Sequence, residues 1–184
     1  MTAPSMLAIE AIRDPLLKVL QTGPRVVLTA PPGAGKSTRL PRYLLDLPDL
    51  AGSIVVLQPR RLAARLLAGR VAEEMGVALG DVVGFQTRHE RAVIATTRIR
   101  FVTDGLFLRQ LQASPQLPGV GAVILDEFHE RSLESDLALG LVTQLQEGER
   151  PDLKLVVMSA TLDGQRIADW LRCPWLNVEG RAHP

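Results

Sequence analysis

The stretch that most constrains the fold of this chain is the run APPGAGKST at Ala30–Thr38. An apolar run, residues 26–28, comes before it, and residues 40–45 after it can form a helix. A strand, a glycine-rich turn that ends in Lys-Ser and a helix, in this order, are typical of a loop that binds the phosphate groups of a nucleotide. The alternative is an ordinary Gly/Pro turn between a strand and a helix.

Each residue type in this loop has a chemical reason. Gly33 and Gly35 lack the Cβ atoms that would stop the chain from curling tightly, so backbone N–H groups can converge on a phosphate. Lys36 is expected to reach the β- and γ-phosphates, and the Ser37 hydroxyl to bind Mg²⁺. Ala30 replaces the glycine that usually opens the pattern, so its position must not require a positive φ. The expected nucleotide-binding residues are Gly33, Ala34, Gly35, Lys36, Ser37 and Thr38.

The composition predicts one globular domain of residues 1–184, because 46% of the residues are hydrophobic. The net charge of +1 favours no class of partner. All but three of the 21 basic residues are arginines, which suit phosphate recognition, although a high-GC coding bias gives the same excess. The single cysteine, Cys173, fits a reducing compartment. With no signal-peptide pattern and no membrane-length apolar run, we expect a cytoplasmic protein without membrane contact.

Apolar periodicity alternates along the chain between short strands and amphipathic helices. The predicted strands are residues 25–29, 54–57, 82–85, 99–102, 120–125 and 153–158. The predicted helices are residues 5–21, with a break or restart at Pro15, then 40–45, 61–75, 105–111, 133–145 and 164–171. Asp163 is expected to cap the last of these helices. The alternation predicts an α/β domain with a parallel sheet, helices on both faces and ligands beyond the carboxyl ends of the strands.

Apolar positions also predict an apolar face on two of the helices. In the helix at 61–75, the residues expected on one face are Leu62, Leu66, Leu67, Val71 and Met75. In the helix at 133–145, leucines recur in a row at positions 133, 137, 141 and 145. Both patterns have the spacing of an amphipathic helix.

A second motif, which is acidic, follows the predicted buried strand at 120–125. Asp126 is expected to hold Mg²⁺ beside the phosphates, and Glu127 to act as general base on the attacking water. His129 is interpreted as a hydrogen-bonding link out of the site, because Mg²⁺ prefers oxygen ligands. Taken alone, the pair Asp126-Glu127 is also typical of a solvated strand end.

Together these motifs carry a resemblance to a known family. Lys36-Ser37, the run DEFH at Asp126–His129 and the run SAT at Ser159–Thr161 resemble the first motor domain of a superfamily 2 helicase of the DEAH-box group. The run QPRRLAAR at Gln58–Arg65 and the run DEFHERS at Asp126–Ser132 resemble the bacterial HrpB-type ATP-dependent helicases more closely. Neither the alanine that opens the loop nor the phenylalanine at 128 departs from that type. The resemblance implies a RecA-like P-loop NTPase fold, with ATP and Mg²⁺ as cofactors.

The resemblance also implies further roles. The residues expected to hold a nucleic-acid backbone are Arg60, Arg61, Thr103 and Asp104, and those expected to couple hydrolysis to domain movement are Ser159 and Thr161. The residue chemistry agrees, because arginines pair with phosphates and a threonine hydroxyl can donate to one. The plainer alternatives are a solvated first turn of a helix for the arginines, a helix cap for Thr103-Asp104, and a Ser/Thr turn after a strand.

Four arginines between two predicted strands form a basic cluster in the sequence: Arg88, Arg91, Arg98 and Arg100. Only Glu90 opposes their charge locally. Such a run is typical either of a nucleic-acid contact or of a solvated loop, and the sequence leaves both open.

Nothing after Thr161 resembles the second motor domain that helicases of this group contain. We therefore expect this chain to be the first domain, with RNA or possibly DNA and a second RecA-like domain as its partners. Such a fragment, without the arginine fingers of the second domain, is expected to be nearly inactive. Two alternatives stay open: another P-loop NTPase, and a nucleotide-dependent RNA-binding module without turnover.

Overall fold

An eight-stranded sheet lies at the centre of the structure, a computed structural model that describes residues 8–160 and 163–178. The strand order is β4-β3-β5-β2-β6-β7-β1-β8. All neighbouring strands are parallel except β3 and β4. The strands are β1 Arg25–Thr29, β2 Ser53–Gln58, β3 Val83–Gln86, β4 Arg91–Ala92, β5 Ile99–Thr103, β6 Val120–Leu125, β7 Lys154–Ser159 and β8 Trp175–Asn177. The predicted parallel sheet is confirmed, with two further short strands, β4 and β8.

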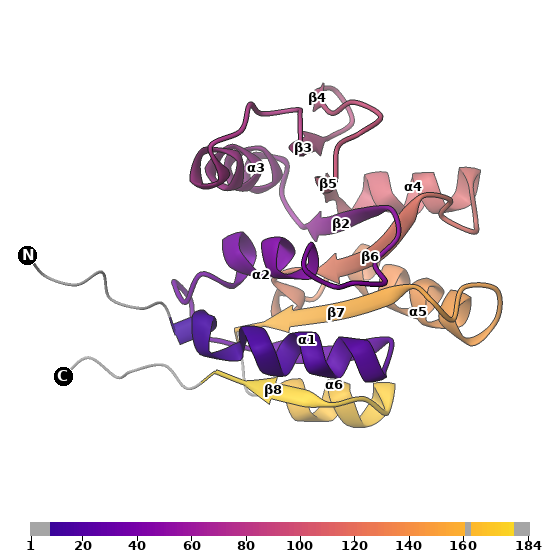
Figure 1. Cartoon of the computed structure of the whole chain (residues 1–184). Helices are drawn as coiled ribbons and strands as arrows, with labels where there is room; N and C mark the ends of the chain where they lie inside the picture. Colours follow the sequence, from indigo (N-terminus) through magenta and orange to yellow (C-terminus); the bar gives the residue numbers. More distant parts are fainter. Residues whose placement is uncertain (1–7, 161–162, 179–184) are drawn as a thin grey trace, which may run out of the picture.

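Helices cover both faces of this sheet (Figure 1). One layer contains α1 Arg13–Thr22, α2 Lys36–Leu44 and α3 Arg61–Met75, and the other contains α4 Asp104–Ala113, α5 Leu133–Glu147 and α6 Gly164–Leu171. Two 3₁₀ helices, Ala8–Ile12 and Phe128–Glu130, complete the described helical elements. Along β1, Val26 and Leu28 pack into the first layer and Val27 into the second. Such strands are apolar at successive positions because both faces are buried.

The first predicted helix differs from the observed one. The chain forms a 3₁₀ helix at Ala8–Ile12 and then α1 from Arg13, while residues 5–7 lie outside the described part. Pro15 neither breaks nor restarts α1, because it lies in the first turn, where its missing N–H would have no partner in the helix. Among the described residues, no helix is both long and apolar enough to cross a bilayer.

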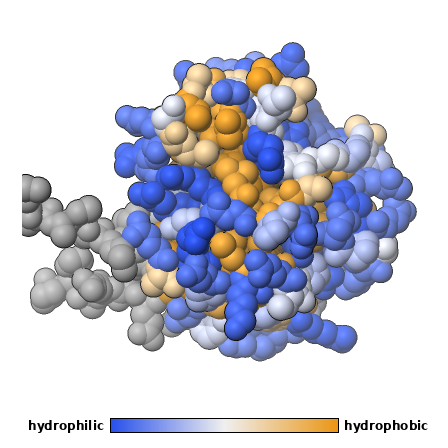
Figure 2. Space-filling model, viewed as in Figure 1, coloured by the Kyte–Doolittle hydropathy of each residue, from blue (hydrophilic) through white to orange (hydrophobic). Residues whose placement is uncertain are grey.

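The prediction that Leu62 and Leu66 share one face of α3 with Val71 is wrong. Leu62 and Leu66 are 66% and 61% exposed, and the side that packs on the sheet carries Ala64, Ala68 and Val71 instead. At about 100° of rotation per residue, Leu62 and Leu66 lie on roughly the opposite side of the helix from Val71, so packing Val71 and the alanines on the sheet leaves these two leucines pointing outward. Figure 2 shows apolar surface in the upper part of the view, where Figure 1 places α3.

The leucine row of α5 behaves in the same way at its start. Leu133 and Leu137 are exposed, whereas Ala138, Leu139 and Val142 face the core. At α6, Asp163 precedes the helix but makes no side-chain capping hydrogen bond, so the predicted cap is wrong.

Because the strands are parallel, their carboxyl ends meet at one edge of the sheet. The register pairs Thr29 with Ser159, and Gln58 with Thr103. Leu125 lies opposite Leu57, so the residue after each of them, Asp126 or Gln58, lies at the same level. The arrowheads of β2, β7 and β8 point to this edge, on the left of Figure 1. The loops that leave it bring together the motifs identified in the sequence.

Candidate nucleotide and nucleic-acid site

The loop after β1 has the backbone that a phosphate loop requires. Gly33 and Gly35 have φ of +77° and +87°, in the left-handed region that L side chains rarely adopt. No atom lies within 4 Å of a Cβ built on Gly33, so backbone conformation rather than crowding explains this glycine. Ala30 has no positive φ and is buried, and its N–H donates to the Ser159 carbonyl at 3.1 Å. An alanine is therefore accommodated at the first position of the loop.

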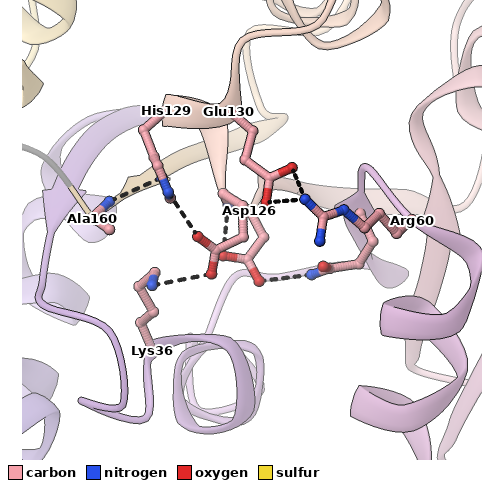
Figure 3. A network of polar contacts seen from close by, with 8 residues as sticks. Lys36, Arg60, Asp126, His129, Glu130 and Ala160 are labelled. Atoms are coloured by element: carbon pink, nitrogen blue, oxygen red, sulfur yellow. Dashed lines mark hydrogen bonds and ion pairs between the residues drawn. The ribbon is translucent and has the colours of Figure 1, made fainter.

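Lys36, the first residue of α2, is turned inward. Its side chain is only 5% exposed, and its Nζ lies 3.1 Å from Oε1 of Glu127 (Figure 3). The loop, Lys36 and Glu127 line a pocket of about 420 Å³. Glu127 has a φ of +52°, an unusual backbone for a residue without the freedom of glycine. This bend turns the acid back from the end of β6 toward the loop.

Asp126 is buried and enclosed by hydrogen-bond donors. Gln58 Nε2 donates to its Oδ2 at 2.6 Å, and the Glu127 N–H donates to its Oδ1 at 2.8 Å. The Ser37 hydroxyl, on the first turn of α2, lies close enough to the carboxylate to stabilise its charged form. Burial raises the pKa of Asp126, and the Ser37 hydroxyl and the hydrogen bond from Gln58 oppose that rise. The carboxylate and the Ser37 hydroxyl thus form an adjacent pair of oxygen ligands next to the loop.

His129 connects the acidic motif to the end of β7. Its Nε2 lies 3.4 Å from Oε2 of Glu127, and its Nδ1 accepts a hydrogen bond from the Ala160 N–H at 3.2 Å (Figure 3). Ser159, one residue earlier, is fully buried at the end of β7. Thr161 lies outside the described residues.

The expected nucleic-acid residues lie beside this site on the same sheet edge. Arg60 precedes α3, and its side chain is 73% exposed. Its Nη2 pairs with Oε2 of Glu130 at 3.1 Å. Arg61, the first residue of α3, is exposed, and Thr103 precedes α4. Both helices start at this edge, so their N-terminal N–H groups face the same solvent as the two arginines.

Asp104 lies too deep for the direct contact expected of it. Its side chain is 7% exposed, and Ser132 Oγ donates to its Oδ2 at 3.4 Å. Burial raises the pKa of Asp104 to about 6, with further contributions from the nearby Glu134 and Glu130. A buried carboxylate, with the same charge as a phosphate, is unsuited to hold a nucleic-acid backbone. Its position instead connects the start of α4 to the start of α5.

The four arginines at 88–100 do not form one cluster. Arg98 donates to the Gly52 carbonyl and Arg100 to Ser53 Oγ, both at the amino edge of the sheet. Arg88 and Arg91 lie at the other edge, where Arg91 pairs with the last residue of β3. The length of a strand therefore separates Arg88 and Arg91 from Arg98 and Arg100. The side chains of Arg98 and Arg100 hydrogen-bond to residues at or just before the start of β2.

Sequence reasoning gave no role to several residues that the site uses. Gln58 holds Asp126, Glu130 holds Arg60, and Arg70 with Glu74 forms the α3 side of the loop pocket. One signal was available for Gln58, since it is a polar residue at the end of an otherwise apolar strand. Its partner depends on the adjacency of β2 and β6, which local sequence does not encode.

The fold and the loop together define a class of protein. A phosphate loop on a parallel sheet, with an acidic strand end two strands away, is the arrangement of a P-loop NTPase domain of RecA-like fold. Within that class, the chain belongs to the DEAD/DEAH box helicase family, which matches residues 10–170.

Similar proteins agree with this family. The chain is 50% identical over 181 residues to ATP-dependent RNA helicase HrpB of Escherichia coli. This match covers 98% of the present chain and 22% of the E. coli protein. It is 41% identical over 170 residues to probable ATP-dependent RNA helicase DHR2 of Saccharomyces cerevisiae, a match that covers 90% of the present chain and 23% of the yeast protein. A crystal structure of the E. coli DExH-box NTPase HrpB matches with a TM-score of 0.94 and 49% identity, over 100% of this chain and 23% of that one. The chain thus spans under a quarter of these relatives, and the predicted family and fold are confirmed.

Proposed function

We propose that this chain is the ATP-binding motor domain of an ATP-dependent RNA helicase and that it works in the cytoplasm. The observation that carries the proposal is the meeting of Lys36, Ser37, Asp126 and Glu127 at one sheet edge, beside exposed Arg60. Phosphate binding and nucleic-acid binding then share the same set of strand ends. Hydrolysis at the first site can therefore act on contacts at the second.

The residues present fit Mg²⁺. Ser37 and Asp126 offer neighbouring oxygen atoms, the ligand type that Mg²⁺ prefers. Within residues 8–160 and 163–178, no group of three or more His, Cys, Asp and Glu side chains could hold a metal. This agrees with Mg²⁺, which takes one or two protein ligands and completes its shell with water and substrate phosphates. When bound, the ion supplies positive charge beside the phosphates.

The catalytic roles follow from the ion pair of Lys36 with Glu127. A γ-phosphate in the loop would take the Lys36 ammonium as its own partner, because a phosphate carries more negative charge than one carboxylate. Glu127 is then free to accept a proton from the attacking water. Its second oxygen faces His129, so a change at Glu127 reaches Ala160 and the segment after β7. We assign coupling to that segment, Ser159 and Thr161 included.

On the nucleic-acid side, Arg60 and Arg61 bind backbone phosphates and Thr103 donates its hydroxyl, with Asp104 as support beneath. Contacts of this kind carry no sequence information, as a motor that moves along RNA requires. The second RecA-like domain of the full-length protein would supply the arginine fingers and the opposite wall of the cleft.

The test is the activity of the 184-residue chain itself. We expect weak binding of a fluorescent ATP·Mg²⁺ analogue and very slow phosphate release, because an arginine finger is worth about 10³–10⁵ in turnover in related NTPases. Single-stranded RNA should not accelerate it. Absence of any nucleotide binding would contradict the ATP site, and robust RNA-stimulated turnover would contradict the requirement for a second domain.

A further inference from the structure

One carboxylate outside the catalytic motifs has three arginine partners. Glu74, near the end of α3, lies 2.7 Å from Arg70 Nε, 3.2 Å from Arg42 Nη1 and 3.7 Å from Arg39 Nε. Arg39 and Arg42 belong to α2, the helix that opens with Lys36, whereas Arg70 belongs to α3. Glu74 therefore joins the helix of the phosphate loop to the helix that follows the proposed nucleic-acid contacts.

This carboxylate also borders the nucleotide pocket. The pocket of about 420 Å³ is lined by the phosphate loop, the start of α2, Glu127, and two residues of α3, Arg70 and Glu74. The Glu74 side chain is 19% exposed, while the Arg70 side chain is 64% exposed. The hydrogen bond from Arg70 lowers the pKa of Glu74, so the carboxylate is ionised at neutral pH.

We propose that Glu74 is a positioning residue for nucleotide binding, which fixes the guanidinium of Arg70 in the wall of the pocket and α3 against α2. The proposal rests on the proposed ATP site. Without the carboxylate, three guanidinium groups would face one another with only the weaker attraction between Glu73 and Arg70 to offset them, and their repulsion would drive the exposed Arg70 away from the others. A long side chain released in this way also regains rotamer freedom, which binding would then have to remove.

The substitution Glu74→Gln tests this through the sign of its effect. Loss of one negative charge beside a site for a polyanion should by itself tighten binding, whereas loss of a positioned arginine should weaken it. The neighbouring Glu73→Gln removes the same charge from the same helix turn, at an exposed residue that has no ion pair among the described contacts. We expect the Kd for a fluorescent ATP·Mg²⁺ analogue to rise about five- to ten-fold in Glu74→Gln. In Glu73→Gln it should stay within about two-fold of the parent.

Two further variants keep the proposal falsifiable if Glu74→Gln loses its fold by circular dichroism. Arg70→Gln removes the exposed partner, leaves Glu74 paired with Arg39 and Arg42, and should weaken binding to a similar degree. Glu74→Asp should recover part of the affinity. In a folded double variant, Glu74→Gln should add little to Arg70→Gln. Two results would show that Glu74 does not act through Arg70. One is a Kd for Glu74→Gln equal to that for Glu73→Gln, and the other is a double variant in which the affinity losses of Glu74→Gln and Arg70→Gln add fully. If the parent chain binds no nucleotide, the ATP site itself is contradicted instead.

Discussion

The proposed phosphate side and the proposed nucleic-acid side of the sheet edge are built differently. Lys36 and Asp126 are each 5% exposed and are held by Glu127, Gln58 and Ser37. On the nucleic-acid side, Arg60 is exposed, and its partner is the single carboxylate of Glu130. The first region is largely pre-formed, whereas the second presents flexible cations to solvent.

This difference agrees with the ligand that we propose for each region. A triphosphate is small and fixed in shape, so pre-formed partners lose little freedom when it binds. A nucleic-acid backbone has to be released and bound again as a motor moves, and exposed arginines with weak partners permit that. Substitutions on the phosphate side should therefore have large effects, and those on the nucleic-acid side small, salt-dependent ones.

The largest effect is expected from Glu127→Gln in the full-length protein. The amide keeps the shape of the side chain but cannot accept the proton, so turnover should fall by about 10²–10⁴ while ATP binding is retained. Steady-state phosphate release measures this. Glu134→Gln, at an exposed position of α5, is the matched control and should keep its rate. A near-parental rate in Glu127→Gln would show that another group is the base.

Next comes Lys36→Ala, which removes the buried ammonium. Binding of a fluorescent ATP analogue should weaken about 100-fold, because charge-assisted hydrogen bonds to the phosphates are lost. Glu127 retains contact with His129, so far-UV circular dichroism should stay unchanged. Lys18→Ala, an exposed lysine on α1, should bind like the parent. Equal affinities for the two variants would contradict the assignment of the loop.

Asp104→Asn probes the support beneath the nucleic-acid side. The pKa of Asp104 in the folded chain, about 6, lies above its ordinary value of 3.8, so the native state binds more protons than the unfolded state between these values. Its contribution to stability therefore falls as pH rises through this range. The asparagine variant lacks this loss, and its stability relative to the parent should increase by about 2 kcal/mol between about pH 4 and about pH 8. Urea unfolding at both pH values checks this, and a constant difference would contradict it.

The smallest effect is expected from Arg60→Gln. RNA binding by the full-length protein should weaken by only about three- to ten-fold, and the slope of log affinity against log salt should fall by about one. Fluorescence anisotropy over a salt series measures both. Arg98→Gln, at the opposite edge of the sheet, should change neither. If Arg98 mattered as much as Arg60, the nucleic-acid surface would have to extend around the sheet.

The sequence by itself determined the local parts of this protein. The phosphate loop was predicted from the run at Ala30–Thr38, and the acidic strand end from the apolar residues before Asp126-Glu127. The parallel sheet was predicted from apolar residues that alternate along the chain between strand and helix spacing. These features follow from neighbouring residues, because glycine content, apolar spacing and helix starts act over a few positions.

Tertiary structure decided which parts meet. Gln58 reaches Asp126 over 68 positions and Arg60 reaches Glu130 over 70, because β2 lies beside β6 in the sheet. It also decided that Leu62 is exposed while Ala64 packs on the strands. Local periodicity shows which residues share a face of a helix, but only the packing of that helix on the sheet decides which of its apolar faces is buried.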